Sequence, residues 1–350
     1  MTNKTDNNPE KGPLARLHDI AARKNIPLEV QFEVTYRCNL ACQHCYVVPA
    51  GTNELSFEEI CTIIDELLEN GTIALTFTGG EVFVRKDFLD ILRYARSKGF
   101  VLDVLTNGTL IDPSVANKLK DLKVAKVEIS LYGATSCTHD TVTQVAGSFD
   151  ATIRAVNLLT ELGVPVCLKT VLMSLNAHEC TEIKSLANKL NADLKVIPFV
   201  TPTKNGDKSP QRLNIDHNQF SLYAKEFPEI IKLDCGAVQD PADRLLCKAG
   251  MGFCSITPEG KINPCVMMPI QVGDLRADTF GRIWFSHDNE PLQRFRSIEK
   301  RELDCAGCSN IQYCDRCAGL AYLETGNFLG SAPSACRVAE WRKQELVDCA

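Results

Sequence analysis

Short apolar runs alternate along this chain with longer segments in which apolar residues recur at helical spacing. The short runs indicate strands, and the longer segments indicate amphipathic helices. The predicted strands span residues 28–35, 73–78, 101–106, 126–130, 166–171 and 194–199. The predicted helices between them span residues 57–70, 88–98, a short stretch from 112, 150–162 and 178–190. The pattern therefore predicts six strand–helix units of roughly 30 residues each.

Capping and turn residues mark the ends of these helices. Ser56, followed three residues later by Glu59, forms a capping box, and Gly71 is a typical helix terminator. Strands that alternate with helices in this way pair in parallel and are joined by crossover helices. Six strands are too few to close the eight-stranded barrel that such units often form. We therefore expect an α/β fold with an open parallel sheet.

The segments on either side of these units predict the domain organisation. The amphipathic pattern of residues 14–24 predicts a short helix, residues 201–210 read as a linker, and residues 216–227 as a bridging helix. A hairpin with its turn at Pro258–Gly260 is predicted between Cys247 and Cys265. We therefore expect five parts: a tail and short helix (residues 1–27), a barrel (28–200), a linker and bridging helix (201–245), a cysteine-rich domain (246–340) and a C-terminal tail (341–350).

Composition excludes several classes of protein. With 350 residues, 45% of them hydrophobic and 23% charged, the chain is typical of a globular protein of about two domains. A net charge of −6 gives no electrostatic reason to expect nucleic acid or an acidic membrane as a partner. No apolar run reaches the roughly 18 residues of a membrane span. The polar first 13 residues, which we expect to be disordered, do not resemble a signal peptide. We therefore expect a cytoplasmic protein.

The 17 cysteines favour metal binding, because a chain without a secretory signal is not expected to use a disulfide framework. Cys38, Cys42 and Cys45 form a C-x3-C-x2-C motif directly after the first predicted strand. Cys thiolates are the usual ligands of iron–sulfur clusters, and three ligands leave one iron of a [4Fe–4S] cluster open to a substrate or cofactor. A structural zinc site needs a fourth protein ligand, which His44 is poorly placed to supply.

The spacing of this motif resembles that of the radical S-adenosylmethionine (SAM) superfamily, in which SAM chelates the open iron. Gly79, Gly80 and Glu81 end the second predicted strand and are similar to the superfamily's GGE motif. The resemblance implies that Glu81 contacts the amino group of SAM, and Ser130, at the end of the fourth predicted strand, matches a position that commonly contacts SAM in relatives. Asn107, at the end of the third predicted strand, either borders the cofactor or simply turns the chain. The resemblance also implies that the six units form a partial (β/α)6 barrel.

A second set of cysteines lies in the last hundred residues. Eight of them can fill two four-thiolate sites, of either zinc or [4Fe–4S] type, and two C-x2-C pairs also suit zinc knuckles. Their order resembles the SPASM extension of radical SAM enzymes, which holds two auxiliary clusters. The resemblance implies the following ligands: Cys247, Cys254, Cys265 and Cys317 for the first cluster, and Cys305, Cys308, Cys314 and Cys336 for the second.

Six cysteines remain outside these sets. Four are expected to be ordinary thiols without a metal, Cys235 is an alternate ligand candidate, and Cys349 is expected to be a free thiol. The four ordinary thiols are Cys61, Cys137, Cys167 and Cys180.

The resemblance implies three [4Fe–4S] clusters and SAM as cofactors, with a flavodoxin- or ferredoxin-type electron donor as a partner. Reductive cleavage of SAM would give a 5′-deoxyadenosyl radical that removes hydrogen from a substrate carbon. A ribosomally made peptide is the first substrate expectation, and a tetrapyrrole side chain in alternative haem synthesis is the second. Because the first strand begins near residue 28, we expect the leader of a peptide substrate to be held by a separate protein, or by the surface near residues 201–210 and the SPASM extension. A non-catalytic zinc-binding interaction protein is a remote alternative.

Overall fold

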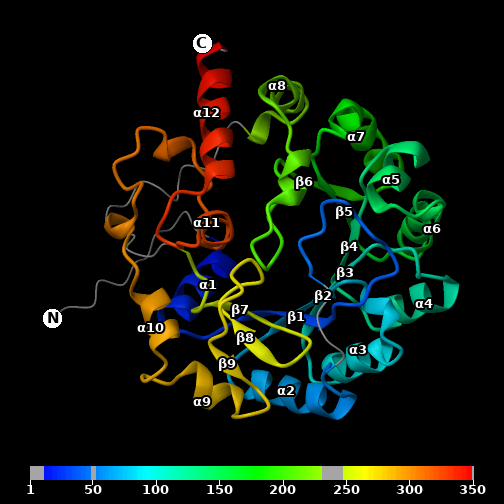
Figure 1. Ribbon diagram of the computed structural model, residues 1–350. Coiled ribbons are helices and arrows are strands. Elements are labelled where there is room, and N and C mark those ends of the chain that lie inside the picture. Colours follow the sequence, from blue (N-terminus) through cyan, green and yellow to red (C-terminus); the bar gives the residue numbers. More distant parts are fainter. Residues whose placement is uncertain (1–11, 49–52, 231–246, 349–350) are drawn as a thin grey trace.

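One curved sheet organises the molecule (Figure 1). The computed structural model describes residues 12–48, 53–230 and 247–348. The sheet has nine strands in the order β6-β5-β4-β3-β2-β1-β7-β8-β9. The strands are β1 (Glu29–Thr35), β2 (Ala74–Gly79), β3 (Val101–Thr106), β4 (Lys126–Ser130), β5 (Val166–Val171), β6 (Asp193–Ile197), β7 (Phe253–Ile256), β8 (Lys261–Asn263) and β9 (Gly273–Asp274). Strands β1 to β6 and the β1–β7 pair are parallel, whereas β7, β8 and β9 form an antiparallel meander.

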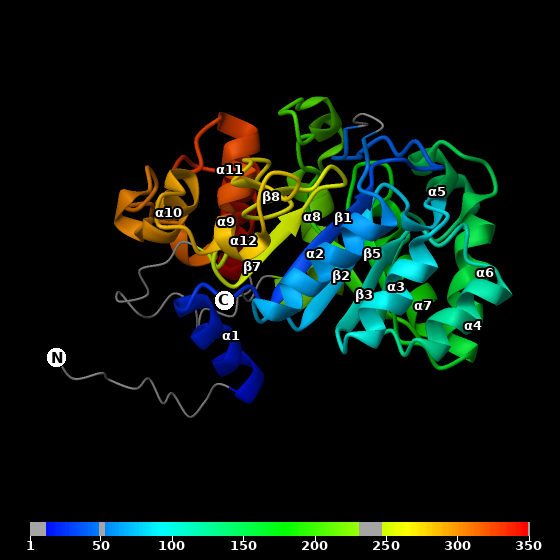
Figure 2. The same cartoon turned by 90° about the horizontal axis from the view of Figure 1, so that it is seen from below.

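The helices lie mainly outside this sheet. They are α1 (Pro13–Arg23), α2 (Phe57–Glu69), α3 (Phe88–Ser97), α4 (Pro113–Asp121), α5 (Ser136–Thr143), α6 (Ser148–Glu161), α7 (Cys180–Lys189), α8 (His217–Glu226), α9 (Phe280–Trp284), α10 (Glu290–Ser297), α11 (Ala318–Thr325) and α12 (Pro333–Asp348). Helices α2 to α7 surround the parallel strands, and the elements after β7 gather beyond β1 (Figures 1 and 2). Fully buried Phe32 and Phe77 of the sheet join Ile60 and Ile64 of α2 in one core, which fixes where the strand ends lie.

The α/β architecture with a parallel sheet is confirmed. All six predicted strands form, and the predicted spans of the third, fourth and fifth are those of the structure. The capping box of Ser56 and Glu59 starts α2, with both reciprocal hydrogen bonds present. The predicted hairpin also forms as β7 and β8. The sequence pattern missed α5, whose residues carry little helical apolar periodicity and whose segment we predicted only as a loop.

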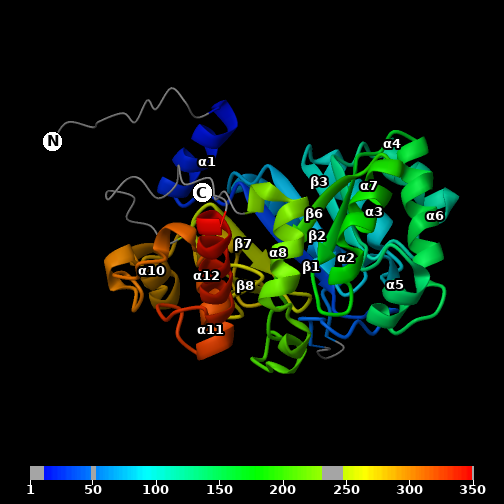
Figure 3. The ribbon, with the colours of Figure 1, turned by 90° about the horizontal axis from the view of Figure 1, so that it is seen from above.

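The cysteine-rich part is joined to the barrel more closely than the predicted division suggests. Strand β7 pairs in parallel with β1, so that Cys254 lies opposite Val30 in one continuous sheet. The domain boundary predicted at residue 340 falls inside α12, which packs along α8 through Trp341 against Phe220, with ring centroids 5.4 Å apart (Figure 3). The expectations for Cys235, for Cys349 and for the polar N-terminal segment up to residue 11 lie outside the described residues.

No helix among the described residues combines the length and the apolar character needed to cross a membrane.

Candidate active site

The loop that follows β1 brings three thiols to the carboxyl edge of the sheet. Backbone hydrogen bonds from Ala41 to Thr143 and from Gln43 to Val142, of 3.1 and 3.0 Å, tie this loop to α5. Burial, together with the nearby thiols of Cys45 and Cys38, raises the pKa of Cys42 to about 12. Each thiolate would disfavour ionisation of the neighbouring thiols. The three thiols can therefore ionise together only when a cation is bound between them. The donor set therefore fits an iron–sulfur cluster with three protein ligands.

The glycines after β2 allow two backbone segments to approach closely. Gly79 has a φ of +143°, and a Cβ there would lie 2.0 Å from the carbonyl oxygen of Thr35. A Cβ on Gly80 would lie 2.4 Å from the carbonyl oxygen of Arg37. Neither position accepts a side chain without moving the backbone. The glycines predicted to approach a ligand thus also fix the strand end against the start of the cysteine loop.

Glu81 lies just after β2 and is held by donors from its own loop and from the end of β3. Its side chain is fully buried, and its carboxylate accepts hydrogen bonds from Thr106 Oγ1 at 2.7 and 2.9 Å. It also accepts from the backbone N–H groups of Asn107 at 2.7 Å and Phe83 at 3.1 Å. Burial raises the pKa of this carboxyl, and the hydrogen bonds partly offset that shift. The carboxylate joins the ends of β2 and β3, while its predicted contact with SAM stays a prediction.

Asn107 connects Glu81 to the cysteine loop. Its side-chain Nδ2 lies 2.9 Å from Asn39 Oδ1 and 3.9 Å from Cys38 Sγ. Such N–H groups stabilise negative charge on sulfur. Asn107 therefore lies beside the first cysteine of the loop, and its contact with the cofactor stays a prediction.

Ser130 ends β4 at the same edge. Its side chain hydrogen-bonds to Tyr132, whose ring meets that of His44 edge-on with the centroids 4.4 Å apart. Tyr132 also stacks on His139, and its backbone N–H donates to His139 Nδ1 at 3.1 Å. Ser130 therefore lies close to the cysteine loop through one intervening tyrosine, and His139 serves as a structural acceptor.

The eight later cysteines gather into two groups of four. In the first group, burial raises the pKa of Cys265 to about 12, and the neighbouring thiols of Cys317 and Cys247 add to the shift. Burial also raises the pKa of Cys254, with Cys265 as the nearest thiol that contributes. Cys317 caps the start of α11 by accepting from the Leu320 N–H at 3.5 Å. This donor set fits a four-thiolate cluster.

The second group surrounds Cys314. Burial raises the pKa of Cys314 to about 11, and the thiols of Cys336, Cys305 and Cys308 raise it further. Cys314 thus lies with this group and Cys317 with the first, although only two residues separate them. Among the described residues no three or more His, Cys, Asp or Glu side chains converge as they would on a single metal ion. In a cubane each thiolate takes a different iron, so its ligands do not converge on one point.

Of the other described cysteines, Cys167 and Cys180 are buried, Cys61 is half-buried and Cys137 is exposed.

The prediction missed a buried ion pair between Glu33 of β1 and Lys204 of the loop after β6. Lys204 Nζ contacts both carboxylate oxygens of Glu33, at 2.6 Å for Oε2, and Glu33 has no exposed surface. Tyr36 completes the cluster by donating to Glu33 Oε2 at 3.0 Å. The alternation of Glu29, Gln31 and Glu33 on one face of the strand was a signal that the barrel interior is polar.

A pocket of about 480 Å³ adjoins this ion pair. The loop after β6 forms one wall with Lys204, Asn205, Gly206 and Lys208. The end of α11 and Pro269 form the other, where Tyr322 is half-buried. The pocket thus opens between the loop after β6 and the cysteine-rich part, where Pro269 and Tyr322 follow Cys265 and Cys317 by four and five residues.

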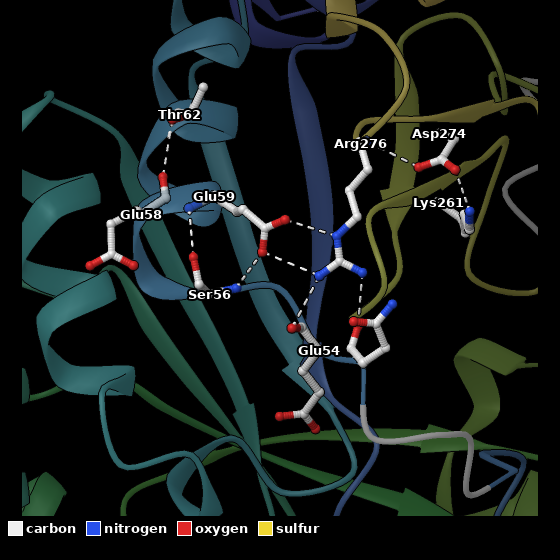
Figure 4. A network of polar contacts seen from close by, with 9 residues as sticks. Glu54, Ser56, Glu58, Glu59, Thr62, Lys261, Asp274 and Arg276 are labelled. Atoms are coloured by element: carbon white, nitrogen blue, oxygen red, sulfur yellow. Dashed lines mark hydrogen bonds and ion pairs between the residues drawn. The ribbon is translucent and has the colours of Figure 1, made fainter.

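A second network, also missed, joins Arg276 of the cysteine-rich part to the segment before α2 (Figure 4). Arg276, which follows β9, binds both carboxylate oxygens of Glu59 at 2.8 and 3.2 Å and the Glu54 carbonyl at 3.2 Å. The Glu54 carboxylate in turn accepts from Arg37 Nη2 at 2.9 Å, next to Cys38. The segment before α2 is therefore held from both sides.

Comparisons with known proteins match this arrangement. A family model described as the radical SAM superfamily matches residues 32–187, and a model described as an iron–sulfur cluster-binding domain, SPASM, matches residues 247–318. The chain is 29% identical to the AdoMet-dependent heme synthase of Methanosarcina barkeri, over 89% of this chain and 97% of that protein. It is 30% identical to the mycofactocin maturase MftC of Mycolicibacterium smegmatis, over 84% of this chain and 77% of that protein.

The fold is similar to that of SuiB from Streptococcus suis, as seen in the crystal structure of SuiB bound to the precursor peptide SuiA. The TM-score is 0.69 at 17% identity, and the match covers 93% of this chain and 80% of SuiB. At this level of identity the likeness concerns the fold alone.

Proposed function

This chain belongs to the radical SAM superfamily and carries a SPASM domain, and we propose that it trims carboxylate side chains of an iron tetrapyrrole. The observation that carries this proposal is the length of the match to the heme synthase, which extends over 97% of that protein. The match to the peptide maturase spans 77% of that protein. The order of the two substrate expectations from the sequence, peptide first and tetrapyrrole second, is therefore reversed.

The three groups of thiols supply the ligands in this proposal. Cys38, Cys42 and Cys45 would hold the cluster that binds SAM, and the two groups of four would hold auxiliary clusters, with Cys317 in the first and Cys314 in the second. The cofactors, when bound, supply a 5′-deoxyadenosyl radical and a site for the electron that the substrate releases. Gly79, Gly80, Glu81, Asn107 and Ser130 would shape the cofactor site, the glycines through their exposed backbone and Glu81 by fixing Asn107.

The pocket beside Lys204 would receive the substrate. It lies between Lys204, whose backbone N–H donates to Tyr46 of the cysteine loop, and Pro269, four residues after Cys265. The Lys208 ammonium at its rim suits a substrate with carboxylate side chains, because an ammonium attracts a carboxylate.

Peptide modification remains the second candidate. The 30% identity to MftC over 84% of this chain favours it. A leader-binding protein and an electron donor of the flavodoxin or ferredoxin type would then be the partners to seek.

Turnover of two probes tests the proposal. Reduced, reconstituted enzyme with SAM is incubated with iron coproporphyrin III, which carries propionate side chains, or with a precursor peptide encoded beside the gene. We expect 5′-deoxyadenosine to form in step with the loss of CO2 and two hydrogens from a propionate. A peptide that loses hydrogens, with the tetrapyrrole untouched, would overturn the proposal in favour of the second candidate.

A further inference from the structure

Lys204 joins the loop after β6 to both ends of the cysteine loop. Its ammonium contacts Glu33, and the Tyr36 hydroxyl lies 3.3 Å away. The same ammonium lies over the rings of Tyr36 and Tyr46, 4.9 and 5.6 Å from their centroids. The Lys204 backbone N–H donates to the Tyr46 carbonyl at 2.9 Å. Tyr36 and Tyr46 flank the three cysteines on either side, so one lysine contacts both flanks.

The ion pair makes this attachment strong. The Lys204 side chain is only 11% exposed and Glu33 is fully buried. If the loop moved away, a carboxylate would remain in the protein interior without its counter-ion, which is costly. Inside the loop, hydrogen bonds from Thr203 N to Asp207 O and from Gly206 N to Thr203 O, both 2.9 Å, keep the turn that presents Lys204.

The same ammonium lies near two groups of cysteines. It lies 5.6 Å from the ring centroid of Tyr46, which directly follows Cys45. Across the pocket that Lys204 lines, Pro269 and Tyr322 follow Cys265 and Cys317 of the first group of four by four and five residues.

We infer that Lys204 is a positioning residue, which holds the loop of residues 203–208 as a wall of the substrate pocket and places a positive charge between the SAM-binding cysteines and the first auxiliary group. The inference rests on the proposed function for its pocket and clusters. A nearby positive charge favours the reduced, more negative state of a cluster. One side chain would thereby link pocket shape to electron supply at both centres.

The chain offers a matched control on the same loop. Lys208 also lines the pocket, and no hydrogen bond or ion pair of its side chain is found among the described residues. Lys208→Met removes the same charge from the loop without touching Glu33. Lys204→Arg keeps the charge and tests whether a conservative change preserves the attachment.

Hydrogen exchange of the full chain tests the first half of the inference. In Lys204→Met we expect the amides of residues 203–207 to exchange about tenfold faster or more, whereas Lys208→Met matches the wild type and Lys204→Arg lies between them. Unchanged exchange in Lys204→Met, or equal acceleration in Lys208→Met, would overturn it. If Lys204→Met does not fold, the double variant Glu33→Gln with Lys204→Met leaves no charge unpaired, and the same acceleration is expected.

A redox titration of reconstituted protein, followed by electron paramagnetic resonance, tests the second half. Lys204→Met should lower the midpoint potentials of the SAM-binding and first auxiliary clusters and leave the second auxiliary cluster unchanged. No shift, or an equal shift at all three clusters, would overturn the inference. Neither measurement uses a substrate, so a wrong substrate assignment would appear in turnover alone and not here.

Discussion

The backbone N–H of Asn107 donates a hydrogen bond of 2.7 Å to the buried Glu81 carboxylate. The side chain of the same asparagine reaches Asn39 and Cys38. The ends of β2 and β3 are thereby joined to the first cysteine of the loop. Glu81 thus fixes the backbone of Asn107 beside the cysteine loop.

Replacing Glu81 by Gln should therefore affect stability first. The new amide group would face Thr106 and two backbone N–H groups, which are all donors, and would leave a buried donor unpaired. We expect a loss of about 1–3 kcal/mol in the free energy of unfolding and a lower iron content. Urea denaturation measures the free energy of unfolding, and Glu29→Gln, at the exposed start of β1, is the control. Unchanged stability with SAM binding weakened tenfold would instead support a direct contact with SAM.

Removing the three loop thiols should abolish SAM cleavage and spare the other clusters. Cys38, Cys42 and Cys45 lie together and apart from the two groups of four. The triple Ala variant should lose about one third of the iron of the fully loaded protein, since one of three clusters is removed. Iron analysis and Mössbauer spectroscopy check this. Complete loss of iron, or continued cleavage of SAM, would show that the ligand sets are assigned wrongly.

Acid should destabilise the protein through two buried imidazoles. Burial lowers the pKa of both His44 and His139 to about 4. Their unfolded pKa is near 6.5, so the unfolded state binds more protons between about pH 6.5 and pH 4. The free energy of unfolding should fall as the pH is lowered through this window. Urea denaturation at pH 7.5 and pH 5 measures the slope. In His139→Gln the free energy of unfolding should depend less on pH. An unchanged pH dependence in this variant would contradict the lowered pKa of His139.

Removing Arg276 should loosen one segment without unfolding the protein. Its ion pair with Glu59 is partly exposed, so we expect Arg276→Ala to cost about 0–1 kcal/mol. The amides of residues 53–59 should nevertheless exchange faster, because Arg276 also holds the carbonyls of Asn53 and Glu54. Arg282→Ala is the control, since Arg282 pairs with Asp278 one helical turn away. Equal exchange in the two variants would show that Arg276 does not anchor the segment.

The features that were predictable from the sequence are local ones. Apolar periodicity located β1 to β6, and a capping box located the start of α2, because both signals lie within a few residues. The spacing of Cys38, Cys42 and Cys45 likewise identified one site within eight residues. The place of Gly79 and Gly80 followed from their position at a strand end.

The features that were missed depend on contacts between distant residues. Lys204 and Glu33 are 171 residues apart, and nothing in the linker distinguishes Lys204 from Lys208 until the fold brings one to β1. The β1–β7 pairing and the clamp of Arg276 are equally long-range. Two of the donors to Glu81, the Thr106 hydroxyl and the Asn107 backbone N–H, likewise lie 25 and 26 residues further along the chain.

Transfer of deuterium tests the central claim most directly. Iron coproporphyrin III deuterated on its propionate side chains and a perdeuterated candidate peptide are each offered to the reduced enzyme with SAM. The account predicts that deuterium enters 5′-deoxyadenosine from the tetrapyrrole and not from the peptide, and that the Cys38, Cys42 and Cys45 triple Ala variant transfers none. Deuterium entering 5′-deoxyadenosine from the peptide alone would contradict it.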